Sequence, residues 1–182
     1  MTGIDTRVLR ERAEALSADR AGLRRRLGLS GTVFLFVGTV SELKGVPRMA
    51  AAFREAMTEG GPRATLVVAG RGPLSENLQS ALSGVPSLEL KQLGFVEPAR
   101  LPELYAAADV FVLPTLQDNW SLAVLEAAVA GVPQVFSVYN GGSRDLIDAG
   151  AAGVMIDPLD GAGFAGTLRT MVANPPPRAP AA

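Results

Sequence analysis

Hydrophobic residues gather along this chain in short, nearly unbroken runs instead of alternating with polar residues. The first run, Thr32 to Val37, reads TVFLFV and ends at Gly38. Further runs cover residues 64 to 69, 88 to 90, 110 to 113, 134 to 137 and 154 to 156. Because apolar runs without two-residue alternation are typical of strands covered on both faces, they predict five or six buried β-strands.

Segments with apolar residues at helical spacing separate these runs. Residues 7 to 27 are expected to form one or two helices, broken near Gly22 and ended by Gly28. Further helices are expected at residues 46 to 59, 74 to 82, 101 to 107, 122 to 130, 144 to 149 and 161 to 173. Strands that alternate with helices predict an α/β fold, namely a doubly wound, Rossmann-like parallel sheet of about six strands with helices on both faces.

The same pattern divides the chain into three parts. Residues 1 to 30 are an N-terminal helical segment, and residues 31 to 174 form the Rossmann-like domain. Residues 175 to 182 begin with three prolines and are predicted to be a disordered tail. The length of 182 residues suffices for one domain with a sizeable core.

Composition excludes several function classes. A formal charge of -1 offers no long-range attraction to nucleic acid, and the dense basic run Arg24 to Arg26 is expected to be a solvated helix face. The absence of cysteine excludes disulfides and thiolate catalysis, and the absence of histidine removes the commonest general base and metal ligand. No apolar run reaches the ~20 residues that span a bilayer, and no signal-peptide core is visible, so a soluble, cytoplasmic protein is expected.

Most of the unusual polar and glycine residues fall just after the predicted strands. In a parallel sheet the carboxyl ends of the strands meet at one edge, and ligands bind outside that edge. The loops to consider are therefore residues 38 to 45, 70 to 73, 93 to 98, 114 to 120 and 138 to 143. The segment 70 to 73, GRGP, lacks the third glycine of a dinucleotide fingerprint, which argues against a dinucleotide-dependent oxidoreductase.

Two carboxylates in the segment DNWSLAVLE carry the clearest chemistry. Asp118 lies in a loop and Glu126 about a turn and a half into a helix for which Ser121 is a plausible N-cap. The backbone N–H groups of the first helical turn lie between them and are donors for an anion. Such a pocket suits a ligand with both phosphates and hydroxyls, such as a sugar nucleotide. The alternatives are that Asp118 merely caps the helix and that Glu126 is a solvated helix residue.

Three other loop features allow two interpretations each. Lys44 precedes a helix N-terminus, where an ammonium can meet a phosphate, but it is also compatible with an ordinary surface lysine. Phe95 either flanks a base ring or belongs to the core. The pair Gly141-Gly142 either lets the backbone approach a ligand closely or supplies a turn.

Several segments, in their order and spacing, resemble the C-terminal, nucleotide-sugar-binding half of a GT-B glycosyltransferase of the retaining family 4 type. They are GIDT, FVGTVSELKG, VVAGRGP, LGFVEPARLPELYAAADVFVLPT, DNWSLAVLEAAVAGVP and GGSRDLIDAGAAGVMIDP, which together cover most of the chain. The resemblance implies that this domain is one half of a GT-B fold.

The resemblance also implies roles for individual residues. Glu126 matches the acid that accepts hydrogen bonds from the ribose hydroxyls, Asp118 the acid near the donor sugar, and Lys44 the diphosphate lysine. The nucleotide would further be bound by Gly38, Thr39, Gly94, Phe95, Asn119, Trp120, Ser121 and Leu122. Thr39 stands where the family usually has an arginine. We expect weaker diphosphate binding unless Arg71 or Arg144 reaches the site.

The function implied is donor binding in a retaining transfer of a hexose-like sugar from a nucleoside diphosphate sugar to an unknown acceptor. No obligatory cofactor or metal is expected. The family's N-terminal domain is missing, so the chain is expected to be an excised or truncated domain or one chain of a split enzyme, and to be inactive without that domain in cis or in trans. The alternative is a non-catalytic nucleotide-binding or interaction module. A phosphoacceptor receiver domain is disfavoured because Asp109 begins its strand.

Overall fold

A computed structural model describes residues 6 to 178 of the chain, so residues 3 to 5 of the GIDT segment lie outside it. Six parallel strands form one sheet in the order β3-β2-β1-β4-β5-β6. The strands are β1 (Thr32–Val37), β2 (Ala64–Ala69), β3 (Leu88–Gly94), β4 (Val110–Leu113), β5 (Gln134–Ser137) and β6 (Gly153–Ile156). The predicted parallel α/β sheet is confirmed.

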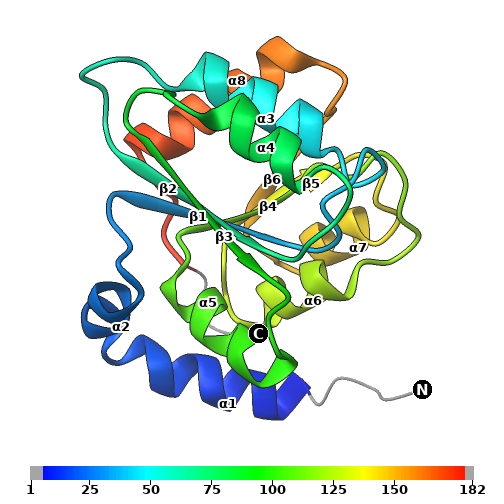
Figure 1. Cartoon of the computed structure of the whole chain (residues 1–182). Coiled ribbons are helices and arrows are strands. Elements are labelled where there is room, and N and C mark those ends of the chain that lie inside the picture. Colours follow the sequence, from blue (N-terminus) through cyan, green and yellow to red (C-terminus); the bar gives the residue numbers. More distant parts are fainter. Residues whose placement is uncertain (1–5, 179–182) are drawn as a thin grey trace.

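Helices cover both faces of the sheet (Figure 1). One face carries α3 (Val46–Ala56), α4 (Ser75–Leu82) and α8 (Gly161–Ala173). The other carries α1 (Thr6–Ser17), α2 (Arg20–Leu27), α5 (Leu101–Ala107), α6 (Leu122–Val129) and α7 (Ser143–Asp148), with the short 3-10 helix η1 (Pro98–Arg100) before α5. None of the helices in residues 6 to 178 is long and apolar enough to cross a membrane.

The order of the strands reverses between β1 and β4. From β1 the chain moves outward through β2 to β3, then returns to β4 and moves outward on the other side. The loops that leave β1 and β4 therefore turn to opposite faces of the sheet at its carboxyl edge. This is where ligands bind in doubly wound folds.

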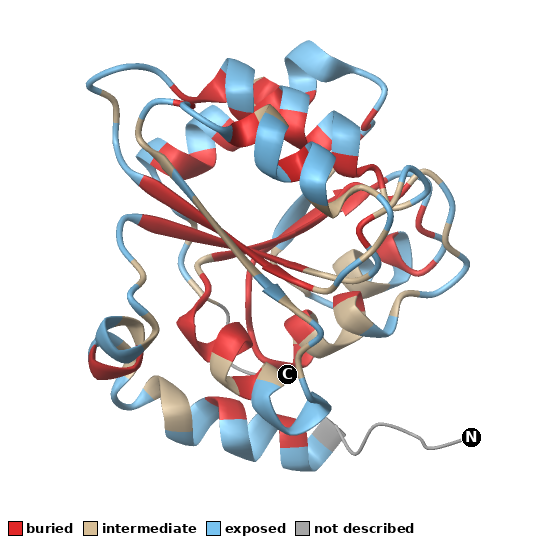
Figure 2. Ribbon diagram, in the orientation of Figure 1, coloured by how far each residue is buried: buried red, intermediate tan, exposed pale blue. Residues whose placement is uncertain are grey.

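The central strands are buried along nearly their whole length, as the apolar runs predicted (Figure 2). Strand β3 differs, because it continues to Gly94 although the apolar run stops before Lys91. Backbone pairing with Val67 and Val68 of β2 extends the strand through Lys91 and Gln92. An edge strand is not covered on every side, so polar residues do not end it.

The N-terminal segment forms two helices, but the predicted break near Gly22 is wrong. The break lies at Ala18 and Asp19, and the Asp19 side chain accepts a hydrogen bond from the backbone N–H of Gly22 in the first turn of α2. A Cβ atom at Gly22 would lie 2.1 Å from the Asp19 carboxylate. Gly22 therefore leaves room for the helix cap and does not mark a chain break. Gly28 ends α2 as predicted, with φ of 64°.

The basic run in α2 is only partly solvated. Arg25 and Arg26 are exposed, whereas Arg24 forms an ion pair with Asp109 and donates a hydrogen bond to the carbonyl of Ala107, at 2.8 Å. Arg20 pairs with the same carboxylate at 2.7 Å. The prediction of a solvated face is therefore wrong for Arg24. The two ion pairs attach α2 to the C-terminal end of α5, where positive charge is favourable.

Asp109, just before β4, is held by more than its arginines. Its carboxylate also accepts a hydrogen bond from the backbone N–H of Val33 at 2.8 Å. Burial alone raises the pKa of Asp109, but the bonds from Val33, Arg20 and Arg24 outweigh burial and leave the pKa below its usual value of 3.8. The carboxylate is therefore ionised and ties β1, β4 and α2 together.

The start of the predicted tail is ordered. Arg178 donates hydrogen bonds to the carbonyls of Tyr105 at 2.9 Å, Ala108 at 2.8 Å and Ala130 at 2.5 Å. Burial and the nearby Arg20 lower the pKa of Arg178 to about 10. The prediction of disorder thus does not describe Arg178, and residues 179 to 182 lie outside the described part of the chain.

Candidate functional site

The loops after β1 and β4 are joined by their backbones at the carboxyl edge of the sheet. The carbonyl of Leu43 accepts hydrogen bonds from the backbone N–H of Leu116 at 2.8 Å and from the hydroxyl of Thr115 at 3.1 Å. Gly45 has φ of 70°, and a Cβ atom there would lie 1.8 Å from the carbonyl oxygen of Pro114. Glycine at this position therefore allows the two loops to touch and places Lys44 beside the β4 loop.

Lys44 and Asp118 form an ion pair between these loops. The Nζ atom of Lys44 lies 2.5 Å from Oδ2 of Asp118, and the two side chains are only 24% and 15% exposed. The second carboxylate oxygen of Asp118 accepts a hydrogen bond from the backbone N–H of Trp120 at 3.3 Å. Lys44 is therefore not an ordinary solvated lysine. Asp118 contacts both the neighbouring Trp120, before α6, and Lys44, which lies 74 residues away in the sequence.

The N-terminus of α6 follows directly. Ser121 occupies the N-cap position, as predicted, but its side chain makes no capping hydrogen bond. The first backbone N–H groups of a helix have no partner within the helix, so those of α6 are donors for a ligand. Trp120 differs from its predicted role, since its N–H already bonds to Asp118. Trp120 and Leu122 expose 48% and 57% of their surface at this end of the helix.

Glu126 points from α6 toward α5 and is not a solvated helix residue. The hydroxyl of Tyr105 donates a hydrogen bond to Oε2 of Glu126 at 2.7 Å. Burial raises the pKa of Glu126, and the bond from Tyr105 opposes this rise. Tyr105 itself is fully buried, and burial followed by the charge of Glu126 raises its pKa, so it acts as a donor.

Sequence reasoning missed Tyr105. It belongs to an apolar helical segment whose spacing indicates only core packing. The one available signal is its hydroxyl, because a buried phenol needs a hydrogen-bond partner.

A hollow of about 410 Å³ opens at the carboxyl ends of β1, β2 and β3. Its lining includes Gly38, Thr39, Arg71 and Phe95. Phe95 is 64% exposed, so it belongs to the hollow and not to the core. Of the two arginines considered as substitutes for the family's arginine at Thr39, Arg71 lines the same hollow as Thr39.

Glycines let the surrounding loops pack closely. A Cβ atom at Gly70 would lie 1.8 Å from the carbonyl oxygen of Gly38, and the backbone N–H of Gly70 bonds to the carbonyl of Gly94 at 2.7 Å. A Cβ atom at Gly72 would lie 2.3 Å from the carbonyl oxygen of Val40. Both glycines of the GRGP segment thus allow close backbone contacts within the chain.

The double glycine after β5 has a similar role. A Cβ atom at Gly141 would lie 2.7 Å from the carbonyl oxygen of Asn119, and one at Gly142 would lie 2.5 Å from the Trp120 ring. The backbone N–H of Gly141 also donates to the carbonyl of Asp118 at 2.9 Å. The close approach that these glycines permit is therefore to the loop that carries Asp118 and Asn119.

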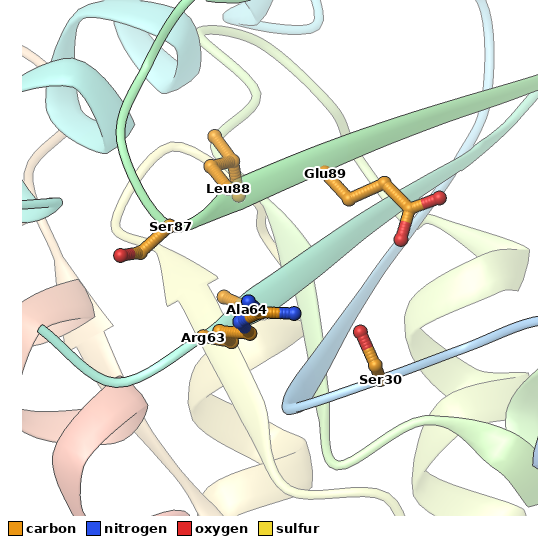
Figure 3. A pocket seen from close by; sticks show the side chains of 6 residues that line it. All are labelled: Ser30, Arg63, Ala64, Ser87, Leu88 and Glu89. Atoms are coloured by element: carbon orange, nitrogen blue, oxygen red, sulfur yellow. The ribbon is translucent and has the colours of Figure 1, made fainter. Parts of the chain in front are cut away.

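A second hollow, of about 300 Å³, lies at the amino ends of the strands (Figure 3). Its lining residues stand just before β1 or at the starts of β2 and β3; they are Ser30, Arg63, Ala64, Ser87, Leu88 and Glu89. The loops that carry the candidate site leave β1 and β4 at the carboxyl edge of the sheet, so this hollow at the amino edge is separate from that site. Within residues 6 to 178 no group of three or more acidic residues is placed to hold a metal ion.

Comparison with known proteins identifies similar chains. The family described as "Glycosyl transferases group 1" matches residues 31–174. A D-inositol 3-phosphate glycosyltransferase of Geodermatophilus obscurus is 33% identical over 178 residues, which cover 86% of this chain and 37% of that protein. This chain spans less than half the length of the curated relatives it matches.

Solved structures share the fold. The C-terminal domain of a glycosyl transferase group 1 family protein (LpcC) from Francisella tularensis superposes with a TM-score of 0.72 at 17% identity, covering 86% of this chain and 83% of that one. Anabaena HepE in complex with UDP-glucose superposes with a TM-score of 0.70 at 22% identity, covering 85% of this chain and 43% of HepE. The fold is therefore that of one half of a GT-B glycosyltransferase.

Proposed function

Because this chain belongs to the glycosyl transferases group 1 family, we propose that it is the donor-binding domain of a retaining glycosyltransferase. The enzyme would transfer a hexose-like sugar from a nucleoside diphosphate sugar to an acceptor held in the cleft with an N-terminal domain. That domain would be supplied in cis or in trans. The chain alone is expected to bind the donor without turnover, because half of the cleft belongs to the partner domain.

The observation that carries this proposal is the ion pair of Lys44, in the β1 loop, with Asp118, in the β4 loop, directly before α6, the helix that also carries Glu126. Lys44 and the first N–H groups of α6 supply positive charge and donors for a diphosphate, and would stabilise the negative charge that develops on the leaving group. Glu126, oriented by Tyr105, would accept hydrogen bonds from the ribose hydroxyls. Asp118 would accept hydrogen bonds from the donor sugar.

The hollow at β1, β2 and β3 is proposed to hold the nucleotide base, with the exposed Phe95 ring against it. Gly38 and Thr39, which line the hollow, and Gly94, which precedes Phe95, would also contact the nucleotide. The relative HepE is solved with UDP-glucose, which supports a nucleoside diphosphate sugar as the donor. No cofactor or metal is part of the proposal.

Titration of the folded chain with UDP-, GDP- and ADP-sugars tests the proposal. Calorimetry should show saturable binding of at least one donor, and Lys44→Met should weaken that binding about tenfold through the lost charge-assisted contact. The control is Lys91→Met, which removes the other lysine of the chain, itself ion-paired and 27% exposed. A folded sample without saturable binding to any of these donors would contradict donor binding.

Tyr105→Phe tests whether the buried hydroxyl tunes Glu126. The hydroxyl favours the ionised carboxylate, so its loss should raise the pKa of Glu126 further. As the pH falls, Tyr105→Phe should therefore lose its affinity for the donor at a higher pH than the unchanged protein does. In alkaline solution Glu126 is ionised in both proteins, and both should bind the donor equally well. Titration of the Glu126 carboxyl carbon by NMR measures the shift directly. Tyr139→Phe, whose hydroxyl faces Asp157, should leave both curves in place.

A second function is favoured by one observation. Thr39 brings no charge to the hollow where the family usually has an arginine, which suits a non-catalytic nucleotide-binding or interaction module. Full-length protein, or this chain reconstituted with an N-terminal domain, separates the two functions. Sugar transfer that is abolished by Glu126→Ala supports the transferase, whereas an assembled protein that performs no transfer supports the module.

A further inference from the structure

Lys44 and Asp118 form an ion pair between the loops that follow β1 and β4. We infer that Asp118 competes with phosphate for Lys44, so that the site favours a nucleoside diphosphate sugar over the free nucleoside diphosphate. This inference rests on the proposed donor-binding function. It assigns Asp118 a role in selecting between donor and product in addition to its contact with the sugar.

Asp118 is held in place by its surroundings. Its backbone N–H donates to the carbonyl of Tyr139 at 3.2 Å, and its carbonyl accepts from the N–H of Gly141 at 2.9 Å. One carboxylate oxygen accepts from the N–H of Trp120. The backbone bonds fix the position of the residue, and rotation of its short side chain would break the bond from Trp120. The carboxylate therefore stands as a fixed negative charge at the β4 loop.

Lys44 is the mobile member of the pair. Its backbone is fixed between Leu43, whose carbonyl accepts two hydrogen bonds from the β4 loop, and Gly45, which packs on Pro114. The four-carbon stem is flexible, and the ammonium has three donors. A phosphate that binds Lys44 must therefore either draw the ammonium away from Asp118 or share it with the carboxylate.

The balance of charges then depends on the ligand. A free diphosphate meets an ammonium that is already neutralised and a carboxylate that repels it at short range. A sugar attached to the diphosphate offers hydroxyl donors to Asp118, which replace the contact with Lys44 as the ammonium turns to the phosphates. The hydroxyls of the sugar thus replace the contact that Asp118 loses with Lys44, whereas a free nucleoside diphosphate offers no such replacement. The nucleoside diphosphate product therefore dissociates more easily than the sugar nucleotide.

The test is Asp118→Asn, which keeps the shape and removes the charge. Calorimetric titration of the whole chain with UDP, GDP and ADP, with their glucose or mannose conjugates, and with inorganic pyrophosphate should show a gain for the sugar-free ligands. Their affinity should rise about fivefold, the scale of a partly exposed charge pair. The affinity of the matching sugar nucleotide should not rise. In a Lys44→Met background the gain should be smaller, because Asp118→Asn then relieves only the direct repulsion and no longer frees an ammonium.

Asp157→Asn is the matched control, since it removes one exposed charge just after β6 at the same edge of the sheet and should change no affinity by more than about twofold. Unchanged or lower affinity of Asp118→Asn for pyrophosphate and for every nucleoside diphosphate overturns the inference, as does an equal gain for the sugar nucleotides. Pyrophosphate has no nucleobase, so its affinity reports on the contact with Lys44 without any contribution from base binding. If no nucleotide binds the unchanged chain, the proposed donor function fails while competition for Lys44 is still decided by pyrophosphate.

Discussion

Glu126→Gln is expected to weaken binding of the nucleoside diphosphate sugar by about 30-fold or more. Two vicinal hydroxyls of the ribose would donate to the carboxylate, and a hydrogen bond to a charged group contributes about 1.5 to 3 kcal/mol. Tyr105 already donates to Oε2, so an amide in this place must turn its NH₂ group either toward Tyr105 or toward the ribose. Both orientations lose an acceptor along with the charge.

Isothermal titration with the donor identified for the unchanged protein measures this loss. Glu55→Gln makes the same chemical change at an exposed position in the last turn of α3. This end of the helix lies at the amino edge of the sheet, so the change should leave the affinity for the donor unchanged. An affinity for Glu126→Gln within about threefold of the unchanged protein would remove Glu126 from the proposed ribose site.

Asp109→Ala is expected to lower the free energy of unfolding by about 3 kcal/mol, the low end for breaking a buried ion pair. The carboxylate is only 13% exposed and accepts bonds from Arg20, Arg24 and the backbone N–H of Val33. Without it the two guanidinium groups face each other, with Arg178 nearby, and the N–H of Val33 loses its partner.

Urea unfolding followed by circular dichroism measures the change. The pKa of Asp109 is lowered in the folded chain, so its contribution is present above the usual value of 3.8 and is lost as the pH falls through the lower folded value. The difference between the two proteins should therefore shrink in that acidic range. Glu89→Ala breaks an ion pair whose acid is 49% exposed, and it should cost less than about 1 kcal/mol. Equal costs for both changes would contradict the role given to Asp109.

The amino-acid pattern located the candidate site but not its internal contacts. Asp118 and Glu126 were predicted on either side of a helix start, and the structure places them in the loop before α6 and within α6. The sequence left open whether each was a site residue or an ordinary acid. Their partners, Lys44 and Tyr105, decide that neither is simply solvated.

Two of the three errors have a common cause. The pattern treated Arg24 as solvated because arginine is usually exposed, yet its partner Asp109 lies 85 residues away. It ended β3 too early because an edge strand need not be apolar. It expected a break at Gly22, where glycine instead makes room for the Asp19 cap. Contacts outside the local window decided the first two outcomes, whereas a cap three residues away decided the third.

The order of strands and helices, the burial of the central strands and the position of the polar loops follow from the sequence, because backbone periodicity and burial act over a few neighbouring residues. The contact between Lys44 and Asp118 does not follow from it. Those residues are 74 positions apart and meet only because β1 lies beside β4 and Gly45 lets their loops touch. Strand order and loop packing depend on the whole chain, so only the tertiary structure decided that the lysine and the first acid of this site are already paired with each other.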